Sequence, residues 1–122
     1  MKVSVKLYHH ATENIMNEAK QALRQTADAV KSDLVQSQTM PFDTGTLQNR
    51  STFVDDSDLN KGIVHIVSDT PYARRLYFHP EYNYQTTKNK YAGGLWFEPY
   101  LKNGSKREFA PNAFARIMKG KI

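Results

Sequence analysis

Four histidines are the side chains of this sequence best suited to acid–base or metal chemistry. His9 and His10 are adjacent, so at most one of them can face a given site on an extended strand. His65 interrupts the apolar run 63–67, and His79 precedes a proline. No pair has the i, i+4 spacing by which a helix holds zinc, and no carboxylate motif accompanies them. We therefore expect no metal site, and we expect His65 to be a half-buried histidine with satisfied hydrogen bonds.

One enzymatic hypothesis for the basic residues is a small ribonuclease. His65 or Glu98 could act as the general base, and Arg74 or Arg75 could stabilise a phosphorane-like charge. These residue types occur in nearly every basic domain, and their spacing here carries no signature. Serine nucleophile elbows, phosphate-binding loops and dinucleotide fingerprints are absent from the sequence. We rank this hypothesis third, and we expect no enzymatic activity, no catalytic residue and no cofactor.

The composition of the chain excludes several classes of protein. The chain has 122 residues, enough for one domain, and 39% of them are hydrophobic, which is typical of a folded domain with a lean core. It has no cysteine, which excludes disulfide scaffolds, zinc ribbons, thiol nucleophiles and iron–sulfur ligation. No apolar run approaches the roughly 18 residues of a membrane-spanning helix. The alternating start carries no apolar signal core, so we expect neither export nor a membrane partner.

The net charge of +5 is concentrated in the second half of the chain. Residues 1–61 hold seven Lys/Arg and eight Asp/Glu, whereas residues 62–122 hold ten against four. A basic half of this kind is typical of proteins that bind nucleic acid or an acidic protein surface. Basic and aromatic residues alternate over residues 74–100, which suits stacking on a single strand. Aromatic residues and arginine are also enriched in protein interfaces, and we favour a core or interface role for them.

The hydropathy pattern predicts strands and one long helix in the first part of the chain. Alternation over residues 2–7 predicts a strand. Apolar residues recur at helical spacing over residues 13–36 and predict a long amphipathic helix. Residues 48–54 and the apolar residues 63–67 predict two more strands joined by a hairpin turn. The last of these reads as a central strand covered on both faces.

The rest of the chain predicts two shorter helices around an irregular insert. Pro71 suits the first position of a short helix, on which Tyr72 and Leu76 could share a face. Residues 79–94 show no periodicity, and such stretches in small domains are usually functional or mobile. Residues 105–108 have the capping-box pattern of a final helix. The predicted fold class is therefore α+β, with the long N-terminal helix packed on a small, mainly antiparallel sheet and a short C-terminal helix.

Three segments in this order resemble phage proteins. Residues 41–47 (PFDTGTL), after a long helix, resemble the D-T-G-x-L element of phage tail-component and tail-completion proteins. Residues 69–76 (DTPYARRL) resemble the tyrosine–alanine segment that follows the central strand in the same group. Residues 93–98 (GGLWFE) and 109–116 (FAPNAFAR) are most similar to minor capsid proteins of long-tailed phages and prophages of Gram-positive bacteria. The likeness covers about residues 11–119.

The resemblance implies a single, non-enzymatic domain over residues 1–122 that serves as a structural virion protein. This would be a minor capsid or head–tail connector (tail-completion) component that assembles as a ring at the phage neck. The implied partners are copies of itself and other neck or tail proteins, in a virion made in the bacterial host cytoplasm. Residues 48–50 lack the basic-then-serine run of the wider group, and the tyrosine-rich residues 81–91 replace its short glycine–threonine link. Both departures favour the minor-capsid branch.

Two sets of candidate site residues follow. Asp43, Thr44 and Gly45 are expected to define a turn, because an aspartate can accept backbone N–H groups and a glycine can take a positive φ. The acidic turn near residue 56 and the basic second half could supply complementary faces between ring subunits. A basic nucleic-acid-binding module is the alternative function. The candidate subunit-contact residues are Asp55, Asp56, Asp58, Arg74, Arg75, Tyr82, Tyr84, Lys88, Lys90 and Trp96.

Overall fold

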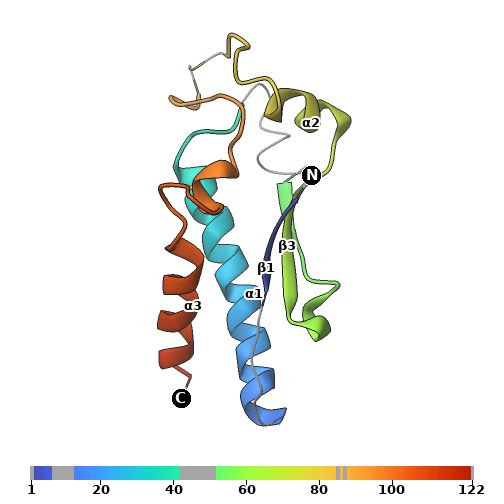
Figure 1. The fold of residues 1–122 in the computed structure, drawn as a ribbon, viewed down its shortest axis with the longest axis vertical. Helices are drawn as coiled ribbons and strands as arrows, with labels where there is room; N and C mark the ends of the chain where they lie inside the picture. Colours follow the sequence, from blue (N-terminus) through green and yellow to red (C-terminus); the bar gives the residue numbers. More distant parts are fainter. Residues whose placement is uncertain (1, 7–12, 42–51, 85, 87, 122) are drawn as a thin grey trace.

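The computed structural model describes residues 2–6, 13–41, 52–84, 86 and 88–121. They form the predicted α+β fold, in which the long helix α1 lies between a sheet and the C-terminal helix α3 (Figure 1). No helix in this part of the chain is long and apolar enough to cross a membrane. The elements in chain order are β1 (Lys2–Lys6), α1 (Glu13–Gln36), β2 (Thr52–Asp55), the 3-10 turn η2 (Leu59–Lys61), β3 (Ile63–Ser68), α2 (Pro71–Tyr77), the 3-10 turn η3 (Glu98–Tyr100) and α3 (Phe109–Lys119).

The sheet has three strands in the order β1-β3-β2, and both neighbouring pairs are antiparallel. The most apolar strand, β3, is central, as predicted, and its Val64 and Ile66 are buried on the side of α1. Residues directly opposite each other share a face, so Phe53 and Val67 lie together on the outer face. No residue of β3 itself is exposed, and His65 on its outer face is buried, so the exposed part of that face belongs to the neighbouring strands β1 and β2. No described helix lies on the outer face, and Phe53 there is 37% exposed (Figure 1).

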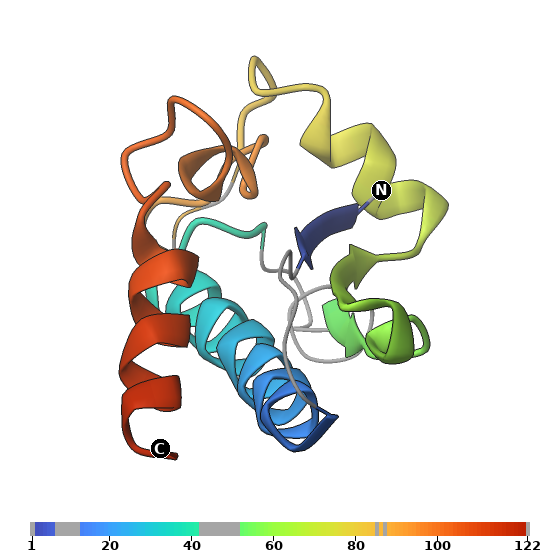
Figure 2. The same ribbon diagram turned by 60° about the horizontal axis from the view of Figure 1, so that its bottom comes forward.

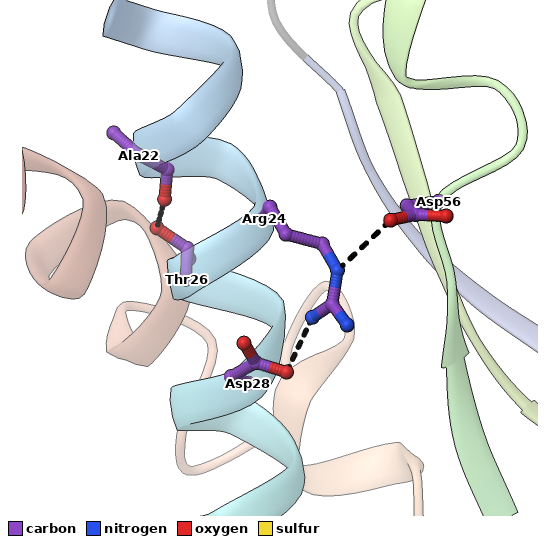
Figure 3. Close-up of polar contacts among 5 residues, drawn as sticks. All are labelled: Ala22, Arg24, Thr26, Asp28 and Asp56. Carbon is purple, nitrogen blue, oxygen red and sulfur yellow. Dashed lines mark hydrogen bonds and ion pairs between the residues drawn. The ribbon is translucent and has the colours of Figure 1, made fainter.

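α1 has the 24 residues predicted for it, because its apolar residues recur at helical spacing. Several of its buried residues are alanines, which let α3 and the sheet approach closely. Thr26 is buried among them, and its hydroxyl donates to the carbonyl oxygen of Ala22 at 2.7 Å (Figure 3). On another side of the helix Arg24 pairs with Asp28, one turn away, as predicted. The apolar buried residues of α1 are Ala19, Ala22, Leu23, Ala27, Val30 and Leu34.

α3 packs along α1, as Figure 2 shows from a second side, and its Ala113 is buried. The helix begins at Phe109, and Glu108 occupies the N-cap position without a side-chain hydrogen bond. The prediction of a capping box over residues 105–108 is therefore wrong. The reason is Pro111, which fits only the first turn of a helix, where its missing N–H costs no hydrogen bond.

A small polar network joins the C-terminal half of α1 to the segment before α3. The Tyr100 hydroxyl donates to Asp33 Oδ2 at 2.6 Å, and Lys106 Nζ donates to the same oxygen at 2.8 Å. Burial acts to raise the pKa of Asp33, but the hydrogen bonds from Lys106 and Tyr100 outweigh it, so that the pKa of this carboxyl is lowered. The folded state therefore favours the ionised carboxylate, and the network stabilises the fold where Asp33 is charged.

We expect Asp33→Asn to lower the free energy of unfolding at neutral pH. Asparagine can still accept from Tyr100 but loses the charge that pairs with Lys106. The difference in the free energy of unfolding between wild type and variant is complete above the ordinary carboxyl pKa of 3.8. It is lost as the pH falls through the lower pKa that Asp33 has in the folded state. Urea unfolding of both proteins along an acid series measures this. Asp69→Asn is the control, because Asp69 is exposed and has no hydrogen bond or ion pair with another described residue. A loss that is equal at every pH would contradict the assignment.

Candidate functional site

α2 presents one side to the body of the protein and the other side to solvent. The Thr70 hydroxyl caps the helix by accepting the N–H of Ala73 at 3.0 Å, and Pro71 stands at its first position, as predicted. Ala73 and Tyr77, four residues apart, are buried and determine which side faces inward. Tyr72 keeps the predicted i, i+4 relation to Leu76 on this helix, but it is 65% exposed and not part of the core.

The turn that follows α2 is fastened to the end of that helix. The Tyr84 hydroxyl lies 2.6 Å from the carbonyl oxygen of Leu76 and 2.7 Å from that of His79, and can donate to either. The rings of His79 and Tyr82 stack with their centroids 4.5 Å apart and their planes within 9° of parallel. Tyr84 therefore holds the turn in place, whereas Tyr82 stays exposed.

Arginine and aromatic side chains meet on the exposed side of α2. A hydrogen bond with the Tyr82 hydroxyl is the main cause that raises the pKa of Arg75, so its guanidinium is charged and lies beside the phenol. Arg74 is exposed next to it in the sequence. Phe78, at the end of the helix, is 57% exposed. The exposed side of α2 thus offers two cations and several aromatic rings.

The second half of the 79–94 insert is fastened to the end of α1. The N–H of Tyr91 donates to the carbonyl oxygen of Gln38 at 3.0 Å, and the side-chain amide of Asn89 donates to the carbonyl oxygen of Met40 at 2.7 Å. The described part of the insert contains turns and bends but neither helix nor strand, as the sequence predicts. The side chains that this arrangement leaves exposed are those of Lys88, Lys90 and Tyr91.

α2 and the insert lie at the same end of the molecule (Figure 1), and we call their exposed side chains the aromatic–basic surface. Five of the ten predicted subunit-contact residues belong to it. Tyr72 and Phe78 are not among the predicted contact residues, although the four-residue spacing of Ala73 and Tyr77 indicates which side of α2 is exposed. No sequence signal indicates Tyr91. The members of the surface are Tyr72, Arg74, Arg75, Phe78, Tyr82, Lys88, Lys90 and Tyr91.

The predicted acidic turn lies at the other end of the sheet from α2 (Figure 1). Each of its three aspartates has a partner within the chain. Asp55 accepts a backbone N–H two residues further on at 3.0 Å, and Asp56 accepts from Arg24 Nε at 3.2 Å (Figure 3). Asp58 Oδ2 lies 3.0 Å from His65 Nε2. These contacts hold the hairpin turn to α1 and to β3, and they leave less free negative charge than the sequence suggests.

His65 is a buried histidine with partners on both ring nitrogens. It is 6% exposed, and its Nδ1 lies 2.6 Å from Ser4 Oγ while its Nε2 faces Asp58. The expectation of a satisfied histidine is confirmed. Glu98 instead accepts from the Tyr77 hydroxyl at 3.1 Å, and no hydrogen bond or ion pair between described residues joins His65 to Glu98 or to the arginines of α2. The described residues also contain no group of three His, Asp or Glu that could hold a metal ion.

Trp96 belongs to the core. It is 1% exposed, and its ring packs edge-on against Tyr77 with the centroids 4.9 Å apart and the planes at 87°. Phe97 is buried beside it. The prediction that Trp96 contacts a neighbouring subunit is wrong, because an interface residue has to reach the surface of its own subunit. The dense aromatic segment 95–101 therefore serves packing.

Comparisons with models of protein families, with curated proteins and with solved structures found no match. The predicted turn at Asp43, Thr44 and Gly45, which carries part of the resemblance to tail-completion proteins, lies outside the described residues.

Proposed function

We propose that this chain is a structural virion protein, a minor capsid or head–tail connector component that assembles as a ring at the phage neck. The observation that carries the proposal is the aromatic–basic surface. Tyr72, Phe78 and Tyr91 are each more than half exposed. Covering their rings with a partner would remove apolar surface from water, which is favourable. Protein interfaces are enriched in such rings and in arginine, and both occur together here.

The anchoring of this surface also favours an interface of defined shape. The cap of α2 by Thr70, the hydroxyl of Tyr84 and the amide of Asn89 each fix a part of it to the body of the protein. A surface that is ordered before it binds loses little conformational entropy on association. The partners that we propose are copies of the same chain and other neck or tail proteins, in a virion made in the bacterial host cytoplasm.

The position of the acidic turn is compatible with a head-to-tail contact between copies. The turn lies at the end of the sheet that is far from the aromatic–basic surface (Figure 1), and heterologous contacts that close produce rings. Because the aspartates already have partners within the chain, and exposed ion pairs contribute only about 0–1 kcal/mol, we assign most of the contact energy to the aromatic rings. Assembly should accordingly respond more to loss of the rings than to salt.

We expect the double change Tyr72→Ser and Phe78→Ser to reduce the number of tailed particles by about tenfold or more, since buried aromatic anchors dominate interface energies. The variants replace the gene in a lysogen, the prophage is induced, and electron microscopy counts heads with and without tails. Mass spectrometry of purified particles tests for the chain itself. Phe53→Ser is the matched control, because Phe53 is exposed outside this surface. A chain that is absent from particles, or an equal loss with the control, would overturn the proposal.

A nucleic-acid-binding module is the second candidate, because the same surface combines rings and cations. Lys90 Nζ lies 5.6 Å from the centre of the Tyr91 ring. Stacked bases with phosphates on lysine and arginine would bind a single strand. Titration with single-stranded DNA and RNA separates the candidates, since phosphate binding must weaken steeply between about 50 and 200 mM salt. RNA cleavage that is lost in His65→Ala would instead support the third candidate, a ribonuclease.

A further inference from the structure

Three polar side chains form a hydrogen-bonded chain on the outer face of the sheet. Ser4 of β1 lies directly opposite His65 of β3 in the strand register, and its Oγ is 2.6 Å from His65 Nδ1. On the other side of the ring, His65 Nε2 is 3.0 Å from Oδ2 of Asp58, which precedes the turn η2. A nucleophile bonded to a base, with the base oriented by a carboxylate, is the general arrangement of an activated serine.

The chemistry of the three groups determines where the protons lie. The hydrogen bond with His65 is the main cause that lowers the pKa of Asp58, so this carboxylate is ionised at neutral pH and can only accept. In neutral His65 the proton therefore resides on Nε2, and Nδ1 has the lone pair. The Ser4 hydroxyl then donates to Nδ1, which places its proton on the path to the base.

The base of this chain of groups is buried and the nucleophile is exposed, as a reactive serine requires. His65 is buried between the strands and held at both nitrogens, so its ring cannot turn away from Ser4 without losing both contacts. Ser4 itself is exposed on β1, which is an edge strand among the described strands. A small electrophile can thus reach Ser4 from solvent, while the base stays fixed behind it.

We propose that Ser4 is an activated nucleophile that accepts acyl groups from small activated esters. Ser4 Oγ attacks the ester carbonyl carbon and forms the new C–O bond as its proton passes to His65 Nδ1. The bond to the leaving alkoxide or phenolate breaks, and the departing oxygen takes the proton back from Nδ1. The products are O-acylated Ser4 and a free alcohol or phenol, and His65 returns to its neutral form. This reactivity is independent of the proposed role in the virion.

A fluorophosphonate probe tests the proposal on the full chain, because it reacts with an activated serine by the same path with fluoride as the leaving group. Peptide mass spectrometry follows the labelling rate of each serine. Ser4 should react about 100-fold faster than Ser32 and Ser105, which are exposed serines with no histidine partner among the described residues. Ser4→Ala should abolish labelling of this peptide.

Two variants separate activation from simple exposure. Asp58→Asn and His65→Gln should each slow the labelling of Ser4 at least tenfold, since one removes the orienting carboxylate and the other the base. Asp55→Asn is the matched control, because Asp55 lies opposite His65 in the register but bonds to the backbone of its own turn. Thermal unfolding is measured in parallel, and if His65→Gln does not fold, Asp58→Asn and the wild-type rates decide. Labelling of Ser4 at the rate of Ser32 and Ser105, or a rate unchanged by Asp58→Asn, would overturn the proposal.

Discussion

Trp96→Ala is expected to lower the free energy of unfolding by about 3–5 kcal/mol, the usual cost of removing a large aromatic side chain from a core. Trp96 is 1% exposed and lies against Tyr77 and Phe97, so its removal leaves a cavity that these rings cannot fill without losing their own contacts. Because small domains are stable by about 5–15 kcal/mol, the variant should be close to unfolding. Urea unfolding followed by circular dichroism measures the change.

Trp96→Phe is the matched control for this prediction. It keeps an aromatic ring in the cluster and removes the indole N–H, which is buried and has no hydrogen-bond partner among the described residues. We expect a loss of less than about 1.5 kcal/mol, because the smaller ring gives up some packing while the cost of the unpaired donor disappears. The wild type should show the blue-shifted fluorescence of a buried indole, as the chain has one tryptophan. A loss below about 1 kcal/mol with alanine would show that Trp96 is not a core residue.

Gly104→Ala should also destabilise the protein strongly, by about 3 kcal/mol, the upper part of the range for overpacking. A Cβ at this position would lie within 3.0 Å of the carbonyl oxygens of Glu98 and Pro99. Backbone atoms can give way only if η3 moves, and η3 is held by the bonds from Tyr77 to Glu98 and from Tyr100 to Asp33. The substitution is therefore expected to strain the hydrogen bond between η3 and Asp33 of α1.

The same glycine-to-alanine substitution at two other positions provides the controls. A Cβ at Gly120 would have its nearest neighbour at 3.5 Å, and one at Gly93 would have it at 4.0 Å, both ordinary contact distances. Alanine at either position should change the melting temperature little, whereas Gly104→Ala should lower it by about 10 °C or more, since each kcal/mol corresponds to about 4 °C in a domain of this size. Equal effects at Gly104 and Gly120 would contradict the explanation by steric overlap.

The elements of the fold that could be predicted are those decided by local pattern. The periodicity of residues 13–36 determines a helix whatever its neighbours are, and Pro71 begins α2 because its fixed φ suits a first helical turn. The position of β3 at the centre of the sheet follows from its apolar composition. A single sequence predicts such elements because each depends on residues that are close together in the chain.

The features that could not be predicted depend on how distant elements meet. α3 packs on α1, and Phe53 on the outer face of β2 is left partly exposed. The segment 95–101 has the composition of either a core or an interface, and only packing against Tyr77 places Trp96 in the core. The contact of Ser4 with His65 requires the register of β1 on β3, which no local pattern specifies.

The pairing of β1 with β3 has a consequence for the order in which the chain folds. Ser4 and His65 are 61 positions apart, whereas β2 and β3 are joined by a short turn. Closing a long loop costs more entropy than closing a short one, so we expect the β2–β3 hairpin and α1 to associate before β1 is added. Until then one edge of β3 has unpaired N–H and C=O groups, which a second nascent chain can bind in place of β1. β1, which is synthesised before β2 and β3, is thus the last of the three strands to pair, and the speed of that step sets how long each new chain can misassociate.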